Sequence, residues 1–88
     1  MLEFIDEAVN VEVQAEPDGR LRPLAFWWQE RRFQITSWGR ESRDEVEGRA
    51  VHLYLVQTAG PESWELSRDV ASGQWTLVRR WRSKYQAV

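Results

Sequence analysis

The chain has 88 residues, with 14 acidic and 12 basic side chains and a net charge of −2. A chain of this length predicts a single domain over residues 1–88, whose small core needs large side chains; six Trp, three Phe and two Tyr supply them. Cysteine is absent and His52 is the only histidine, which excludes disulfides, thiolate catalysis and cysteine-based zinc sites.

No apolar run approaches the roughly 18 residues of a membrane span. The first residues, MLEFIDEAVNVE, are acidic where a signal peptide would be basic. We therefore expect a soluble cytoplasmic protein that does not act at membranes. No nucleophile motif, phosphate loop or dinucleotide fingerprint occurs, so we expect no enzyme activity, no cofactor and no metal site. His52 is expected to be a hydrogen-bonded histidine near the rim of a sheet.

The first predicted strand spans residues 8–14, where Val9, Val11 and Val13 alternate with polar residues. Pro, Asp and Gly cluster directly after it, so residues 15–22 are predicted to form a connection.

The stretch LAFWWQERRFQITSW, residues 24–38, predicts a hairpin with a two-residue turn at Glu30–Arg31. Apolar side chains then gather on one face of the hairpin, as a half-buried sheet requires. Glu–Arg is not a favoured pair for such a turn. The pairs expected in this register are Trp28 with Phe33, Phe26 with Ile35, and Leu24 with Ser37.

Residues 39–49, GRESRDEVEGR, hold a single apolar residue and a Gly near each end, and they predict a solvated, flexible loop. Three further strands are predicted at 51–58, 62–68 and 74–81, with turns at 59–61 and 69–73. The expected pairs are Val56 with Trp64, Tyr54 with Leu66, Leu66 with Trp75, and Trp64 with Leu77.

Six short strands joined by tight turns predict an all-β fold, a small antiparallel meander that is curled or barrel-like. The ends, about residues 1–3 and 83–88, are expected to fray. The predicted core comprises Phe26, Trp28, Phe33, Ile35, Tyr54, Val56, Trp64, Leu66, Trp75 and Leu77.

Trp27 shares the polar face of the predicted hairpin with Arg32 and Gln34. A Trp beside an Arg is how single-strand binders stack bases and hold phosphate. With Arg80 of the last strand, these residues are the candidate contacts to a ligand or to nucleic acid. We favour the alternative, in which Trp27 is covered by the N-terminal strand or by residues 39–49.

Leu53, Leu55 and Val78 are expected on the sheet face opposite the aromatic core, together with Arg80. Three aliphatic side chains exceed what a solvated face needs. Either a second copy of the chain or the N-terminal segment covers this face, and the sequence does not choose between them.

Charge is divided between the ends of the chain. Residues 1–18 carry six acidic residues and no basic one. Residues 74–88 carry no acid; their bases are Arg79, Arg80, Arg82 and Lys84. We expect the two ends to lie side by side and neutralise each other. The alternative is a basic tail, with Trp81 and Tyr85 interleaved, that follows a phosphate backbone.

Short motifs follow one another in a distinctive order from Phe4 to Trp81. They are FIDE at 4–7, then Arg22, Pro23, Phe26, Trp28, Arg32, Phe33, Ile35, Tyr54, Val56, Thr58, Trp64, Glu65, Leu66, Asp69, Gly73, Trp75, Leu77, Arg79 and Trp81. This order resembles a small bacterial family of uncharacterised domains, found alone or appended to error-prone, translesion-type DNA polymerases and their accessory proteins. Glu30 stands where the family often has Gly, and Leu55 where it tends to have a polar or charged residue.

The resemblance implies a role near DNA replication or repair and defines no catalytic residue. The sequence therefore predicts a non-catalytic binding or accessory module with an unknown protein partner, a second copy or nucleic acid as its partner. The alternative is an interaction domain that forms homodimers through Leu53, Leu55 and Val78.

Overall fold

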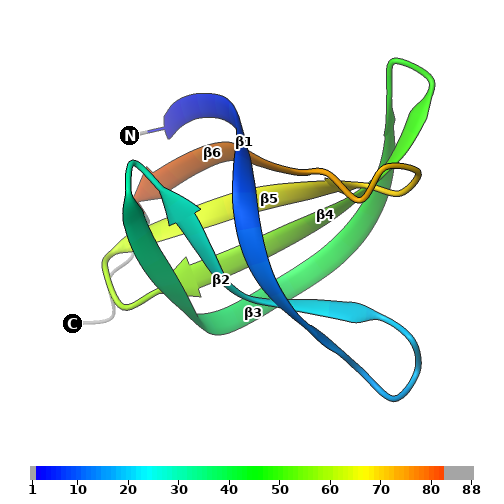
Figure 1. Cartoon of the computed structure of the whole chain (residues 1–88). Helices are drawn as coiled ribbons and strands as arrows, with labels where there is room; N and C mark the ends of the chain where they lie inside the picture. The colour runs from blue at the N-terminus through cyan, green and yellow to red at the C-terminus, as the bar shows by residue number, and fades with distance from the viewer. Residues whose placement is uncertain (1, 83–88) are drawn as a thin grey trace.

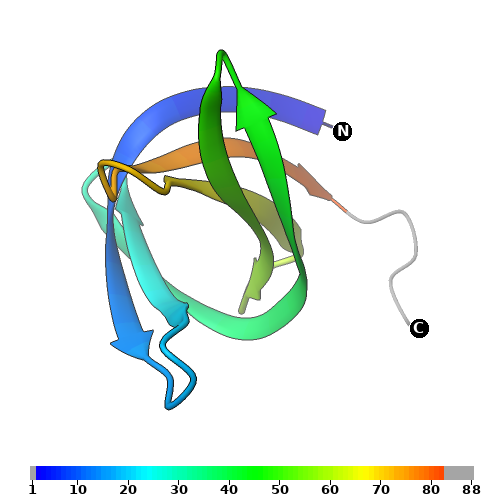
Figure 2. The same ribbon diagram turned by 90° about the vertical axis from the view of Figure 1, so that its right-hand side faces the viewer.

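The computed structural model describes residues 2–82. Its six strands run antiparallel in chain order, and each pairs with the next. The first strand also pairs with the last, so the meander closes into a barrel (Figures 1 and 2). The predicted all-β, barrel-like meander is confirmed. The strands are β1 Leu2–Ala15, β2 Leu21–Trp28, β3 Arg31–Val46, β4 Arg49–Thr58, β5 Glu62–Asp69 and β6 Trp75–Arg82.

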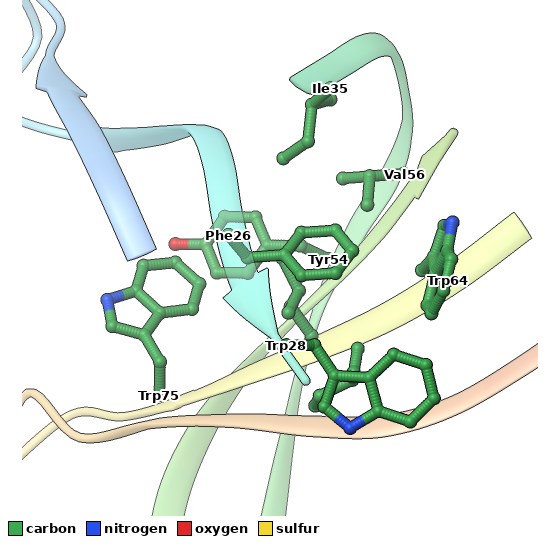
Figure 3. Packing of buried hydrophobic residues seen from close by; sticks show 9 residues of the cluster. Phe26, Trp28, Ile35, Tyr54, Val56, Trp64 and Trp75 are labelled. Carbon is green, nitrogen blue, oxygen red and sulfur yellow. The ribbon is translucent and has the colours of Figure 1, made fainter. Parts of the chain in front are cut away.

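The alternation of side chains along each strand sends the large apolar residues into the barrel, where aromatic rings from several strands converge (Figure 3). Phe33 is only partly buried and packs against this cluster; the other predicted core residues are all buried within it. The buried cluster consists of Phe26, Trp28, Ile35, Tyr54, Val56, Trp64, Leu66, Trp75 and Leu77.

The hairpin of β2 and β3 turns at Gln29–Glu30, one residue earlier than predicted. Both turn residues have positive φ, 51° and 62°, as a type I′ turn requires. Phe26 therefore pairs with Phe33, and Trp28 with Arg31. The predicted register at Glu30–Arg31 is wrong by two residues, and a shift of two leaves every side chain on its predicted face.

Residues 39–49 are not a flexible loop, and that prediction is wrong. They form the end of β3, the turn Glu47–Gly48 and the start of β4, a hairpin that extends beyond the ring (Figure 1). The turn residues have φ of 51° and 75°, so Glu47–Gly48 supplies the left-handed backbone of a tight hairpin. The charged side chains remain exposed, as expected, because this hairpin extends past the end of the barrel core.

β1 is longer than the predicted strand 8–14 because it pairs with two neighbours. Its first part pairs with β6, from Leu2 to Val9, and its second part with β2, from Asn10 to Ala15. The pairing with β6 shifts register between Phe4 and Glu7, and Asp6 there has φ 53°. The predicted fraying is wrong for residues 2 and 3, whereas residues 1 and 83–88 lie outside the described residues.

The second half of the barrel has one predicted register confirmed and one corrected. β4 and β5 pair as predicted, Tyr54 with Leu66 and Val56 with Trp64. β5 and β6 instead pair Leu66 with Leu77 and Trp64 with Arg80. The register shifts between Glu65 and Leu66, a bulge that the alternation pattern does not reveal.

The meander places its turns at two ends of the barrel. At one end, called the β2–β3 end, lie the turns at 29–30 and 59–61. At the other, called the β3–β4 end, lie the connections at 16–20, 47–48 and 70–74 (Figure 1).

Candidate functional site

The β2–β3 end carries a cavity of about 450 Å³, called here the aromatic mouth. The indoles of Trp28 and Trp64 and the ring of Phe33 form its aromatic wall. The rest of its lining includes arginines from β3 and β6, small and polar residues, and one acid, Glu62 of β5. Three of the four predicted ligand contacts, Arg32, Gln34 and Arg80, meet in this one cavity.

Trp27, the fourth predicted contact, lies on the outer face of β2 next to the mouth. Its side chain is 41% exposed, so the favoured interpretation, a Trp27 covered by another segment, is wrong. The Arg32 guanidinium carbon lies 5.7 Å from the Trp27 ring centroid, and Arg32 Nη1 donates a 2.8 Å hydrogen bond to Gln34 Oε1. The structure therefore assembles the predicted set of Trp27, Arg32 and Gln34 on one face.

Arg32 is also bound to an acid. Its Nη2 lies 2.6 Å from Glu12 Oε2 of β1. Both side chains are a little under half exposed, and exposed ion pairs contribute only about 0.2–1 kcal/mol. A phosphate group could replace Glu12 at this guanidinium at small cost.

Arg80 does not lie on the outer face with Leu53 and Val78, and that prediction is wrong. The register shift between β5 and β6 turns it toward the barrel axis. Its guanidinium carbon lies 4.9 Å from the ring centroid of Trp28 and 5.6 Å from that of Trp64. Arg80 therefore covers the aromatic mouth from β6 by cation–π contact.

The indole N–H of Trp28 is buried and has no acceptor among the described residues. Two other indoles that pack in or against the core have acceptors: Trp38 Nε1 donates to the Pro23 carbonyl at 2.7 Å and Trp64 Nε1 to Thr58 Oγ1 at 3.2 Å. A buried Trp N–H usually finds a partner. The aromatic mouth thus contains an indole whose hydrogen-bonding capacity is unused.

The acidic N-terminal segment was expected to neutralise the basic residues at the other end of the chain, and it does so for one of the described arginines, Arg80. Arg80 Nε lies 2.7 Å from Glu3 Oε1 of β1. Arg79 and Arg82 instead pair with acids of β5, Glu65 at 2.6 Å and Glu62 at 3.8 Å. Lys84 and Tyr85 of the predicted basic tail lie outside the described residues.

The three aliphatic residues predicted to form a self-association face are each half-buried, but they do not share one depression. Leu53 and Val78 line an open groove of about 510 Å³ beside the projecting β3–β4 hairpin. Leu55 lines a different depression near Trp38, where its Cβ lies 3.4 Å from the position that a Cβ would take at Gly39. The N-terminal segment closes the barrel against β6; only its Asp6 reaches the rim of the groove.

The β3–β4 end holds a second polar cluster, which the sequence reasoning missed. Arg43 Nε donates to His52 Nε2 at 3.0 Å, and His52 Nδ1 lies 3.4 Å from the Tyr54 hydroxyl. His52 is thus hydrogen-bonded near a barrel rim, as predicted. Burial, and then the nearby Glu41 carboxylate, raise the pKa of Tyr54, which keeps its hydroxyl protonated. Arg43 went unrecognised because it falls in the stretch expected to be a loop.

Comparisons with family models, with curated proteins and with solved structures find no match to this chain. No helix with the length and apolar character of a membrane span occurs between residues 2 and 82. Within the same residues, no three His, Asp or Glu side chains are gathered as metal ligands would be.

Proposed function

We propose that this protein is a non-catalytic module that binds single-stranded nucleic acid and serves DNA replication or repair. The proposed contact surface is the aromatic mouth together with Trp27. The observation that carries the proposal is that three arginines line one aromatic-walled cavity and that exposed Trp27 lies beside one of them, Arg32. The association with replication or repair rests on the order of the sequence motifs.

Stacking supplies the first part of the binding energy. Trp27 offers an indole that is 41% exposed, and Phe33 offers a partly buried ring at the mouth. Bases stack on such rings whatever their sequence, and each stack contributes about 1–3 kcal/mol. A single strand could place one base on Trp27 and a neighbouring base in the mouth.

Arginines supply the second part. Arg31 is exposed, its guanidinium carbon lies 5.2 Å from the Phe33 ring centroid, and no acid among the described residues lies within ion-pair distance of it. Arg32 stands beside it with only a surface ion pair. These two guanidinium groups are placed to hold phosphates between stacked bases.

The test is a titration of a labelled oligothymidylate with the protein at low salt, followed by fluorescence anisotropy. Trp27→Ala should weaken binding by about 1–3 kcal/mol and leave the melting temperature nearly unchanged. Arg32→Ala should also weaken binding, and the slope of log K against log salt should fall by about 0.7, because one phosphate contact is lost.

Arg40→Ala is the matched control, since Arg40 is an exposed arginine of the same strand outside the aromatic mouth. It should change the affinity no more than the loss of one distant charge does. The proposal fails if the wild-type protein shows no salt-dependent binding, or if Trp27→Ala lowers stability without affecting binding.

A second candidate function is self-association, and the groove beside the β3–β4 hairpin favours it. Leu53 and Val78 line this groove with Val46, which is 46% exposed at the end of β3. Apolar side chains gathered in an open groove are a common mark of a contact surface. The proposed occupant is a second copy of this chain.

A further inference from the structure

We propose that the β3–β4 end binds a phosphate group between Arg43, His52 and Arg68. This site lies at the opposite end of the barrel from the aromatic mouth and goes beyond the proposed nucleic-acid surface.

The sheet register builds the site. His52 of β4 lies directly opposite Arg43 of β3 on one side and Arg68 of β5 on the other. Directly opposed residues share a face, with Cβ atoms about 4.5–5.5 Å apart. Two guanidinium groups therefore flank one imidazole in a row across three strands, and the row contains no carboxylate.

The row opens into a cavity of about 590 Å³ that is also lined by Arg20, Glu41 and Tyr54. Its acids are already engaged: Arg20 lies 3.2 Å from Asp18 and 3.5 Å from Glu41. Neither Arg43 nor Arg68 has an acid within ion-pair distance among the described residues. With three arginines and the two acids Asp18 and Glu41 in its lining, the cavity has an excess of one positive charge, in a chain whose net charge is −2.

Existing hydrogen bonds determine which groups of this site can still donate to a ligand. Arg43 Nε donates to His52 Nε2 at 3.0 Å, so a neutral imidazole carries its proton on Nδ1, next to the Tyr54 hydroxyl. The terminal amino groups of Arg43 remain free to donate, as does the whole guanidinium of Arg68. Paired guanidinium donors match the oxygens of an oxyanion, and a phosphate offers more charge and more acceptors than a carboxylate.

The test is a titration of the ¹⁵N-labelled protein with inorganic phosphate, followed by NMR, with sodium chloride added to hold ionic strength constant. We expect saturable shifts of the amides of residues 43, 52 and 68 and a rise in melting temperature, because phosphate binds only the folded state. Acetate at equal ionic strength should produce neither effect.

Arg43→Gln and Arg68→Gln should each weaken phosphate binding at least tenfold, whereas Arg40→Gln on the same strand as Arg43 should not. Without phosphate, Arg68→Gln should melt no lower than the wild type, since the substitution removes no ion pair among the described residues. A structural role for Arg68 would instead lower the melting temperature and leave phosphate binding unchanged.

Glycerol phosphate and a 5′-phosphorylated dinucleotide, titrated in the same way, distinguish the source of the phosphate. Tighter binding of either ester than of inorganic phosphate identifies a phosphorylated compound as the ligand, and tighter binding of inorganic phosphate identifies the free ion. Shifts that do not saturate, that chloride reproduces, or that survive Arg68→Gln would overturn the proposal.

Discussion

Trp75 lies at the closure of the barrel, opposite Val9 of β1 and Arg68 of β5. Its ring centroid lies 5.1 Å from that of Tyr54, and its side chain is buried. We expect Trp75→Ala to lower the free energy of unfolding by about 3–5 kcal/mol, as other large aromatic truncations do. That is a large part of the roughly 5–15 kcal/mol that holds a small domain together.

Urea denaturation followed by far-UV circular dichroism measures this loss, and Trp27→Ala is its control. Trp27 is exposed, so its removal should cost much less than the removal of Trp75. An unchanged urea midpoint for Trp75→Ala would contradict the packing described for the second half of the barrel.

Asp69 should make stability depend on acid pH. Its Oδ1 accepts hydrogen bonds from the backbone N–H groups of Ser72 and Ala71, both at 3.0 Å, and its Oδ2 lies 3.5 Å from Arg49. These interactions, led by the Ser72 N–H, hold the pKa of Asp69 below its ordinary value, against the opposing effect of burial.

The pKa of Asp69 is lower in the folded than in the unfolded state. The contribution of its carboxylate to folding stability is therefore complete above the unfolded pKa, about 3.9, and is lost as pH falls through the folded pKa. Asp69→Asn should therefore be less stable than the wild type at pH 7. Thermal melts at a series of pH values should show the difference shrinking below about pH 4. A difference that stays constant from pH 7 to pH 3 would contradict this account.

At the scale of the element, the β2–β3 turn carries avoidable strain. Gln29 and Glu30 both adopt positive φ, a region that glycine enters without steric cost. Glu30→Gly should therefore raise the free energy of unfolding by about 0.5–1 kcal/mol. Chemical denaturation measures the gain, and Glu30→Ala, which relieves no strain, should show none.

The faces of the strands were predictable from the sequence, whereas their registers were only partly so. Period-2 alternation decides which side chains point inward, and a shift of two residues in the first hairpin does not change that. The bulge between Glu65 and Leu66 is different, because it adds a residue to one strand and reverses the sides that follow. Arg80 was misplaced for that reason, although Leu77 was assigned correctly.

The two sites also differed in how far the sequence predicted them. Trp27, Arg32 and Gln34 came from one hairpin, so a local pattern was sufficient to group them. The row of Arg43, His52 and Arg68 depends on pairings across three strands, and one of those strands carries a charged stretch with no apolar alternation. Only the turn at Glu47–Gly48 signals a hairpin there.

At the scale of the whole molecule, self-association can be tested by a substitution in the groove beside the β3–β4 hairpin. If a second copy binds there, Leu53→Glu should shift dimers to monomers while the barrel stays folded, because an unpaired charge cannot remain in an apolar contact. Sedimentation velocity over a wide range of protein concentration measures the shift. Leu55→Glu is the matched comparison and should have less effect, since Leu55 lies outside the groove. A wild-type protein that is monomeric at the highest concentration would rule out this function.

The pairing of β1 with β6 also sets an order of events during folding. Residues 2–9 pair with β6, the last strand. During translation this pairing cannot form until nearly all of the described chain has left the ribosome. The other strands form local hairpins, and contacts distant along the chain form more slowly because a long loop must be closed. We expect Ile5→Val to accelerate unfolding and to leave the refolding rate almost unchanged in stopped-flow experiments. Until that last step, the newly made protein exposes two unpaired strand edges, and this is the stage at which it is most prone to aggregate.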